Sequence, residues 1–156
     1  MKKIGTKKLS KSAVTTSLMQ ELFEAALHSQ KHAHAPYSHR YIGAAIMMSD
    51  GRIYSGCNIE NASYGGTVCA ERVAIWSAIS EGAKKPIKEI CVISSEINPW
   101  PPCGMCRQVI AEFAAPETMI YAANPNGTVR SWKFSEIFPE AFTPNHLKNG
   151  STKKKK

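Results

Sequence analysis

Hydrophobic residues in the first part of this chain recur with a helical period. Between residues 17 and 33 they stand three or four positions apart, as on one face of an amphipathic helix. Ser17 and Gln20 form a capping pair at the start of this helix, and Pro36 stops it because proline has no backbone donor. The apolar positions of the predicted helix are Leu18, Leu22, Ala25 and Ala26.

Two short apolar runs follow, at residues 41–48 and 52–58, and the pair Asp50-Gly51 separates them. An Asp-Gly pair between two such runs is typical of a tight β-hairpin, because glycine readily adopts the positive φ that the turn requires. The pattern therefore predicts two antiparallel strands.

A second helical segment, CAERVAIWSAISEG at residues 69–82, has apolar side chains nearly all round it and ends at Gly82. Such a helix is expected to be buried. A strand at residues 87–95 and a proline-rich turn at residues 99–102 come next. A further helix is predicted from Cys103 to about residue 114.

The last predicted strands, at residues 118–123 and 128–134, are joined by the four residues Asn-Pro-Asn-Gly. A crossover between parallel strands needs a dozen or more residues, so these two strands must be antiparallel neighbours. A short helical turn at residues 135–138 follows. The order of elements predicts an α/β fold, a three-layer sandwich in which helices flank a five-stranded mixed sheet.

Length and charge indicate one compact domain, at residues 15–147, between two basic tails. The chain has 156 residues and a net charge of +8, but ten of its 20 Lys and Arg residues lie in segments 1–14 and 148–156. We expect these tails to be flexible. The body keeps 10 basic against 12 acidic residues, which does not suit a nucleic-acid groove. No apolar run suits a membrane span or a signal peptide, and we expect a cytoplasmic protein.

Three of the five cysteines stand in two short motifs, Cys69 in CAE and Cys103 with Cys106 in PCGMC. Three thiolates can hold a zinc ion and leave its fourth position open to water, whose pKa the metal lowers to about 7. Glu71 follows the first of these cysteines by two residues and is the candidate proton carrier. The sequence thus predicts a catalytic Zn²⁺ site.

Both motifs begin predicted helices, and helix N-termini favour thiolate over thiol. Three thiolates leave a zinc site with an excess negative charge, and Arg72 is the candidate group that relieves it. The alternative is a closed zinc ribbon, which would need a fourth ligand such as Cys57, Cys91 or a histidine. We expect both of these cysteines to be small buried residues in strands, and His28 and His32 to lie on a surface helix.

Cysteine, any residue and glutamate, followed by PCxxC, form the signature of zinc-dependent base deaminases. From Pro36 to about Phe142 the chain resembles the small homotetrameric cytidine deaminases. The segments that carry the resemblance, in the order and spacing of that family, are PYSHRYIGAAI, GCNIENASYGG, CAERVAIWSAISEG, PCGMCRQV and IFPEAF.

The resemblance implies hydrolysis of cytidine and deoxycytidine to uridine and deoxyuridine with release of ammonia, as in pyrimidine salvage. Glu71 would carry a proton from water to ring N3 and then to the departing amine. The resemblance also implies that Asn58 and Glu60 bind the ribose. The backbone N–H of Ala70 and the carbonyl of Pro101 would hold the cytosine.

Two aromatic residues and one arginine complete the predicted substrate site. The resemblance places Tyr64 near the pocket, and it places Phe142 in the pocket of a neighbouring subunit of a homotetramer with active sites at its interfaces. Arg40 stands where the family usually has phenylalanine. Since a guanidinium plane can stack on a pyrimidine, Arg40 is a further candidate pocket residue that could alter substrate preference.

Three other functions remain open on the sequence. A deaminase of a modified nucleoside or nucleotide shares the zinc motifs, but NIEN at residues 58–61 favours cytidine. A polynucleotide cytosine deaminase typically has a helix between its last two strands, and this chain has no room for one. A non-catalytic zinc module that binds nucleic acid through its tails would have no use for Glu71.

Overall fold

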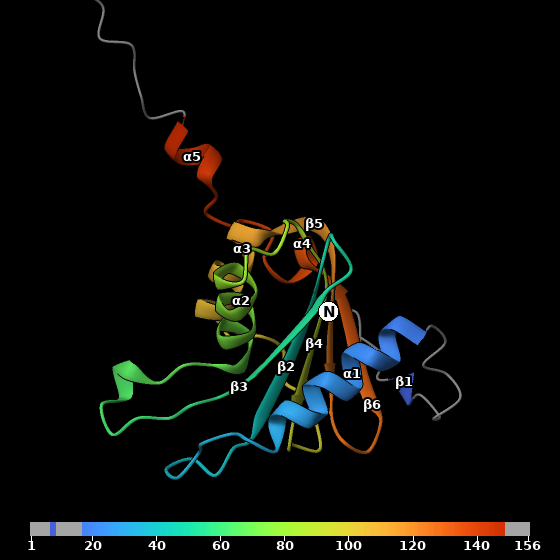
Figure 1. Ribbon diagram of the computed structural model, residues 1–156, viewed down its shortest axis with the longest axis vertical. Coiled ribbons are helices and arrows are strands. Elements are labelled where there is room, and N and C mark those ends of the chain that lie inside the picture. Colours follow the sequence, from blue (N-terminus) through green and yellow to red (C-terminus); the bar gives the residue numbers. More distant parts are fainter. Residues whose placement is uncertain (1–6, 9–16, 149–156) are drawn as a thin grey trace, which may run out of the picture.

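The computed structural model describes residues 7–8 and 17–148, and a mixed β-sheet forms its centre (Figure 1). Strand β2 (Ile42–Met48) and strand β3 (Ile53–Cys57) form the predicted antiparallel hairpin. The glycine of the Asp-Gly turn has a φ of 82°, as this kind of turn requires.

Three further strands complete the sheet. Strand β4 (Ile87–Ser94) pairs antiparallel with β2 and parallel with β5 (Ala114–Ala123). Strand β6 (Thr128–Lys133) pairs antiparallel with β5, as the short connection predicted. The order β6-β5-β4-β2-β3 makes the predicted five-stranded mixed sheet.

A short sixth strand, β1 (Lys7–Lys8), extends the sheet beyond β6, where Lys7 lies opposite Val129. The sequence did not indicate this strand, because two lysines carry no strand preference. It falls inside the segment 1–14 that we predicted as a flexible tail. The other residues of that segment lie outside the described part of the chain.

At the other end, helix α5 (Pro144–Lys148) was not predicted. Residues 149–156, the remainder of the second predicted tail, lie outside the described residues. Among the helices of the described residues, none combines the length and the apolar character that crossing a membrane requires.

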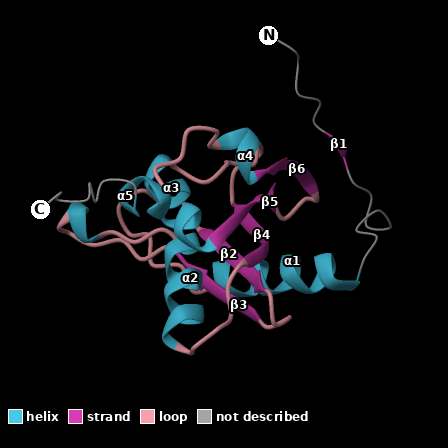
Figure 2. Cartoon of the chain, turned by 90° about the horizontal axis from the view of Figure 1, so that it is seen from above, coloured by secondary structure: helices cyan, strands magenta, loops and turns pink. Residues whose placement is uncertain are grey.

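Helices cover both faces of the sheet, which gives the predicted three layers (Figure 2). Helix α1 (Ser17–Gln30) packs against β2, β3 and β4 on one face. Helix α2 (Ala70–Ser80) packs against β2 and β3 on the opposite face, which α3 (Gly104–Phe113) and α4 (Phe134–Ile137) also cover.

Strand β2 contributes to two hydrophobic clusters, one on each face of the sheet. Ala44 and Ile46 belong to the cluster beneath α2, α3 and α4, whereas Ala45 and Met47 belong to the cluster beneath α1. Successive residues of a strand point to opposite faces, so a strand that is covered on both sides is apolar throughout. This explains the uninterrupted apolar run that the sequence shows here.

Two glycines let the helices approach this hairpin closely. A Cβ atom at Gly43 would lie 2.0 Å from the backbone oxygen of Ala26 in α1. A Cβ atom at Gly56 would lie 2.6 Å from the backbone nitrogen of Ala74 in α2. Both distances are shorter than atoms tolerate, so only glycine fits at these two positions.

Two element boundaries differ from the predicted ones. Helix α1 ends at Gln30, short of Ala33, and the side chain of Gln20 donates to Glu24 (2.8 Å) one turn further along the helix. Strand β5 begins at Ala114, four residues before the predicted start. It accommodates Pro116 because its register with β4 is irregular at that end, where a missing backbone donor is tolerated.

Candidate active site

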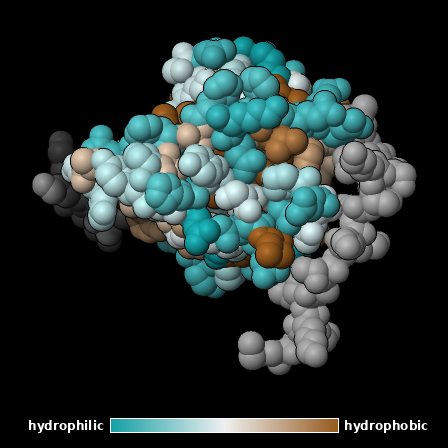
Figure 3. Space-filling view, turned by 90° about the horizontal axis from the view of Figure 1, so that it is seen from below, coloured by the Kyte–Doolittle hydropathy of each residue, from teal (hydrophilic) through white to brown (hydrophobic). Residues whose placement is uncertain are grey.

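The cysteine motifs meet at one end of the sheet, where β4 ends and α2 and α3 begin. The loop after β3 folds back on itself, with Ile59 antiparallel to Val68. This bridge places Cys69, the N-cap residue of α2, beside the end of β3. Cys103 is the N-cap residue of α3. Figure 3 looks onto this end of the molecule, where hydrophilic residues surround small hydrophobic areas.

The sulfur atoms of Cys69, Cys103 and Cys106 lie within 4.8 Å of one another, and the first two are 4.0 Å apart. Zinc–sulfur bonds of about 2.3 Å at tetrahedral angles place sulfur atoms about 3.8 Å apart, so the three thiols fit a zinc ion. Within the described residues, no histidine, carboxylate or further cysteine joins this group as a fourth ligand. Cys57 and Cys91 lie in β3 and β4, outside the group. The site is therefore open, as predicted.

The thiols of Cys69 and Cys106 differ in how readily they ionise. A hydrogen bond from Cys106 and the nearby Arg72 guanidinium hold the pKa of Cys69 well below its ordinary value. The same contact with Cys69, together with burial, raises the pKa of Cys106. Cys69 is therefore the thiol of this pair that loses its proton first, and a metal ion displaces the remaining protons when it binds.

Glu71 lies in the first turn of α2 and is 4% exposed. Burial raises the pKa of Glu71 from 4.5 to about 7, because a charged carboxylate loses its hydration there. A carboxylate with this pKa can take up and release a proton near neutral pH. The structure thus places the predicted proton carrier beside Cys69 and Cys106.

The predicted charge-balancing residue, Arg72, contacts the first metal ligand directly. One guanidinium nitrogen donates to the carbonyl of Thr67 (2.9 Å) and lies 3.9 Å from the sulfur of Cys69. The guanidinium also stacks over the ring of Trp76, 5.7 Å from its centre. These contacts hold a positive charge beside Cys69, in the position that the predicted charge-balancing role requires.

The predicted ribose ligand Asn58 follows β3 and is 8% exposed. Its Nδ2 donates to the carbonyl of Arg40 (2.8 Å), and its Oδ1 accepts from the N–H of Ile42 (2.8 Å). One Nδ2 proton and one lone pair remain for a substrate. Ala70 is the first residue of α2, where backbone N–H groups have no partner inside the helix.

The other predicted ribose ligand, Glu60, accepts from the backbone N–H groups of Tyr37 (2.9 Å) and Ser38 (3.2 Å) and from the hydroxyl of Ser38. The Ser38 hydroxyl and these amides lower the pKa of Glu60, which keeps the carboxylate ionised. Tyr64 lies exposed in the same loop region, and its ring packs edge-on against Tyr37 at 6.0 Å.

Three other predicted substrate residues contact parts of the chain away from the three cysteines. Pro101 lines a hollow that none of the three cysteines lines. The exposed Phe142 stacks on His146 at 5.3 Å. The guanidinium of Arg40 forms an ion pair with Glu96 at 2.5 Å. Within one chain, these contacts do not test the substrate roles, which stay predictions.

Sequence reasoning missed the residues that hold the site in shape. Trp76 stands four residues after Arg72 on one helix, and this spacing could have indicated the stacking. The contacts of Glu60, Arg40 and Arg72 with Ser38, Glu96 and Thr67, respectively, are made in loops, and no local sequence pattern indicates them.

An open site of three thiolates beside a buried glutamate is suited to activating water, so the fold and the site together define a zinc-dependent hydrolytic enzyme. Residues 16–123 match the family described as the cytidine and deoxycytidylate deaminase zinc-binding region. The chain belongs to this family.

Individual proteins of known identity agree with that assignment. A cytidine deaminase of Halalkalibacterium halodurans is 43% identical over 128 residues, which are 82% of this chain and 96% of the relative. One from Sporosarcina psychrophila is 38% identical over 129 residues, 83% of this chain and 94% of the relative. The crystal structure of cytidine deaminase from Burkholderia pseudomallei is 41% identical, with a TM-score of 0.74 over 79% of this chain and 98% of that one.

Proposed function

We propose that this protein hydrolyses cytidine and deoxycytidine to uridine and deoxyuridine, releasing ammonia, as a step of pyrimidine salvage. The observation that carries the proposal is the open three-cysteine site with Glu71 buried beside it. The relatives named cytidine deaminase, which align with most of this chain, support the same substrate.

Glu71 performs the proton transfers of this reaction. Cys69, Cys103 and Cys106 would hold zinc, which would supply a water of lowered pKa as the nucleophile. Glu71 would accept a proton from the attacking water and donate it to ring N3. It would then accept the remaining proton of the hydroxyl added at C4 and donate it to the amine, which leaves as ammonia. In the metal-free site, burial raises the pKa of Glu71, which favours uptake of a proton by this carboxylate.

The loops around the metal bind the nucleoside. Glu60 is ionised and therefore suits the hydroxyl donors of a ribose, and Asn58 retains one donor and one acceptor for the same sugar. The N–H of Ala70 and the carbonyl of Pro101 hold the polar edge of the cytosine.

The assembly that we propose is a homotetramer with active sites at subunit interfaces. Phe142 and Tyr64 are both exposed in the single chain. Large exposed aromatic side chains commonly mark contact surfaces, and Phe142 reaches the pocket of a neighbouring subunit in this arrangement.

The test is a panel of substrates with the purified, zinc-loaded protein. The loss of the 4-amino group changes ultraviolet absorbance, which is followed with cytidine, deoxycytidine, their monophosphates and a cytosine-containing oligonucleotide. We expect turnover of the two nucleosides. Turnover of the oligonucleotide alone would overturn the proposal, and turnover of the monophosphates alone would move it to nucleotides.

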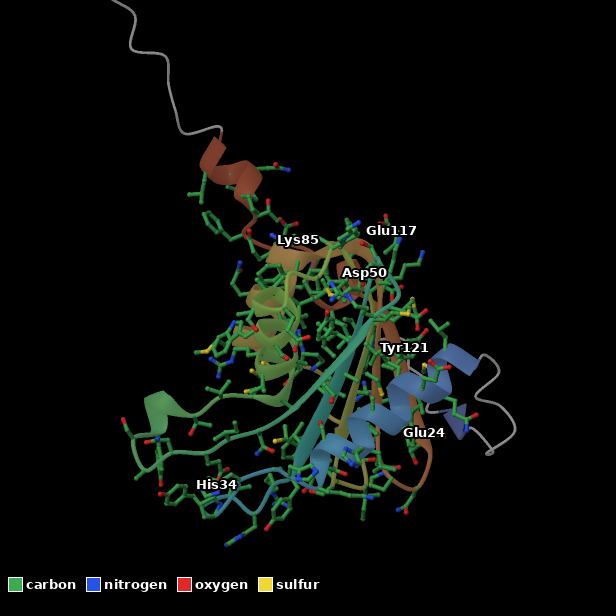
Figure 4. The ribbon with its side chains drawn as sticks, viewed as in Figure 1. Glu24, His34, Asp50, Lys85, Glu117 and Tyr121 are labelled. Atoms are coloured by element: carbon green, nitrogen blue, oxygen red, sulfur yellow. The ribbon has the colours of Figure 1, made fainter. Side chains whose placement is uncertain are left out.

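The variant Glu71→Gln tests the mechanism. Glutamine keeps the shape of the side chain but cannot carry a proton, so cytidine turnover should fall by about a hundredfold or more while bound zinc per chain is unchanged. Glu117→Gln is the control, because Glu117 is exposed near the opposite end of the sheet (Figure 4). Wild-type turnover in Glu71→Gln would contradict the mechanism.

A further inference from the structure

We propose that Arg40 and Glu96 form an ion pair that positions the two ribose-binding residues, Asn58 and Glu60. The inference rests on the proposed function for its substrate. It assigns Arg40 a positioning role in place of stacking on the pyrimidine, and it brings in Glu96, which the sequence did not single out.

The ion pair continues the sheet beyond its last regular residues. Strands β2 and β4 are antiparallel, with Ile42 opposite Ser94. One step further, the N–H of Ser95 donates to the carbonyl of Tyr41 (3.2 Å). The next facing positions are 40 and 96, so the ion pair occupies the place of a cross-strand pair, where opposite charges stabilise the pairing of strands.

The backbone of Arg40 is connected to both ribose-binding residues. Its carbonyl accepts from Nδ2 of Asn58 at 2.8 Å. Its N–H donates to the hydroxyl of Ser38 at 3.1 Å, and that hydroxyl donates to the carboxylate of Glu60. A shift of Arg40 therefore displaces the partners of Asn58 and Glu60 together.

The segment before β2 needs such an anchor. His39 has a φ of 55°, in the left-handed region that non-glycine residues seldom adopt. The carbonyl of Tyr41 is held from α1 by the side chain of Gln30 (2.8 Å). From the side of β4, the Arg40–Glu96 ion pair and the backbone bond of Ser95 hold the segment.

The ion pair is only partly shielded from water. The side chains of Arg40 and Glu96 are 53% and 25% exposed, respectively. Exposed ion pairs contribute little to global stability and weaken in salt. Loss of the Arg40–Glu96 ion pair should therefore change KM for the substrate more than it changes the free energy of unfolding.

The test uses Arg40→Ala, Glu96→Gln and the double variant in steady-state assays with cytidine. Each single change should raise KM about two- to fivefold and leave kcat within about twofold, as expected for the loss of one exposed ion pair. The double variant should be no worse than either single one, because one interaction is removed in all three. Size-exclusion chromatography checks that assembly is unchanged.

Two further measurements separate positioning from general loss of structure. The charge exchange Arg40→Glu with Glu96→Arg should restore KM toward the wild-type value. At about 1 M salt, the wild-type KM should rise toward that of the single variants, because screening weakens the pair. The proposal would be overturned if the charge exchange did not restore KM and salt did not raise the wild-type KM.

A matched control pair exists at the far end of the sheet. Arg52 and Asp50 form an ion pair at 3.0 Å with side chains 49% and 17% exposed. Figure 4 shows Asp50 at the end of the sheet opposite to His34, whose carbonyl accepts from the N–H of Glu60 (2.7 Å). The variant Arg52→Ala should leave KM and kcat unchanged.

Two outcomes distinguish the alternatives. If Arg40 stacks on the substrate instead, Arg40→Ala raises KM but Glu96→Gln does not, which overturns the positioning role.

If the wild-type protein turns over no nucleoside, the proposed function fails, and amide hydrogen exchange still tests the ion pair. Exchange of residues 37–42 should then be faster in Arg40→Ala and Glu96→Gln than in Arg52→Ala, and equal rates would overturn the proposal.

Discussion

At the scale of single residues, the environment of Glu71 and Arg72 explains their different uses. Both stand in the first turn of α2, but Glu71 is buried and Arg72 reaches the sulfur of Cys69. Burial raises the pKa of this carboxyl, because its ionised form has lost much of its hydration, and this suits the proton transfer proposed for it. The guanidinium cannot lose its proton and acts through its fixed charge.

The contact of the Arg72 guanidinium with the sulfur of Cys69 predicts the effect of Arg72→Ala. Removing the guanidinium leaves the thiolate cluster with its excess negative charge, so kcat/KM for cytidine should fall by about 10- to 100-fold while the three cysteines are intact. Measurements of zinc per chain and of kcat separate weaker metal binding from slower chemistry.

Arg52→Ala is the control for that experiment. The guanidinium of Arg52 also lies over an aromatic ring, that of Tyr54, 5.5 Å from the ring centre, and it pairs with Asp50. This change should leave activity intact. Wild-type rates in Arg72→Ala would show that the charge balance is unimportant.

At the scale of elements, the close approach of helices to the β2–β3 hairpin decides where the site forms. Gly56 lets α2 lie directly on β3, and the N-cap of α2 carries the first metal ligand, Cys69. Gly43 does the same for α1 on the opposite face. The hairpin is thereby held from both sides, and its end carries Asn58.

We expect Gly43→Ala to destabilise the fold by about 1–3 kcal/mol, because the added methyl group would overlap the backbone of α1 and the helix would have to move. Denaturant unfolding measures the change. Gly65→Ala is the matched control, since nothing lies within 4 Å of a Cβ atom there. Equal stability of the two variants would contradict the proposed close packing.

At the scale of the whole molecule, the metal site joins parts of the chain that are far apart in sequence. Cys69 begins α2 and Cys103 begins α3, with all of β4 between them. A metal ion at this site would therefore link two helices that lie on the same face of the sheet. Since a site of this kind does not exist in the unfolded chain, the free energy of metal binding adds to the stability of the fold.

Removal of zinc should therefore lower the Tm by roughly 10 °C. This shift is expected when the free zinc concentration is about a thousand times the Kd. Thermal unfolding with and without a chelator measures the shift, and added zinc should reverse it. In Cys103→Ser the chelator should have a much smaller effect, whereas in Cys57→Ser the full shift should remain. An unchanged Tm after verified zinc removal would contradict this role of the metal.

Local sequence patterns predicted most of the elements, the chemistry of the candidate ligands and two pairings of strands. Asp50-Gly51 and the four-residue connection before β6 specify hairpins, because short turns leave the chain no other geometry. The three cysteines and Glu71 could be proposed as site residues because zinc chemistry requires those residue types at that spacing, and the structure brings the three sulfur atoms together. These features depend on residues that are near one another in the sequence.

Only the tertiary structure decided the order of the strands, the acidity of Glu71 and the partners of Arg40. The pKa of Glu71 depends on how completely other segments bury it, which its own neighbours in the chain do not determine. Arg40 contacts Glu96 because β2 and β4 are adjacent and in a particular register. Strand order and register depend on how both faces of the sheet pack over the whole chain. Local sequence patterns therefore do not predict them.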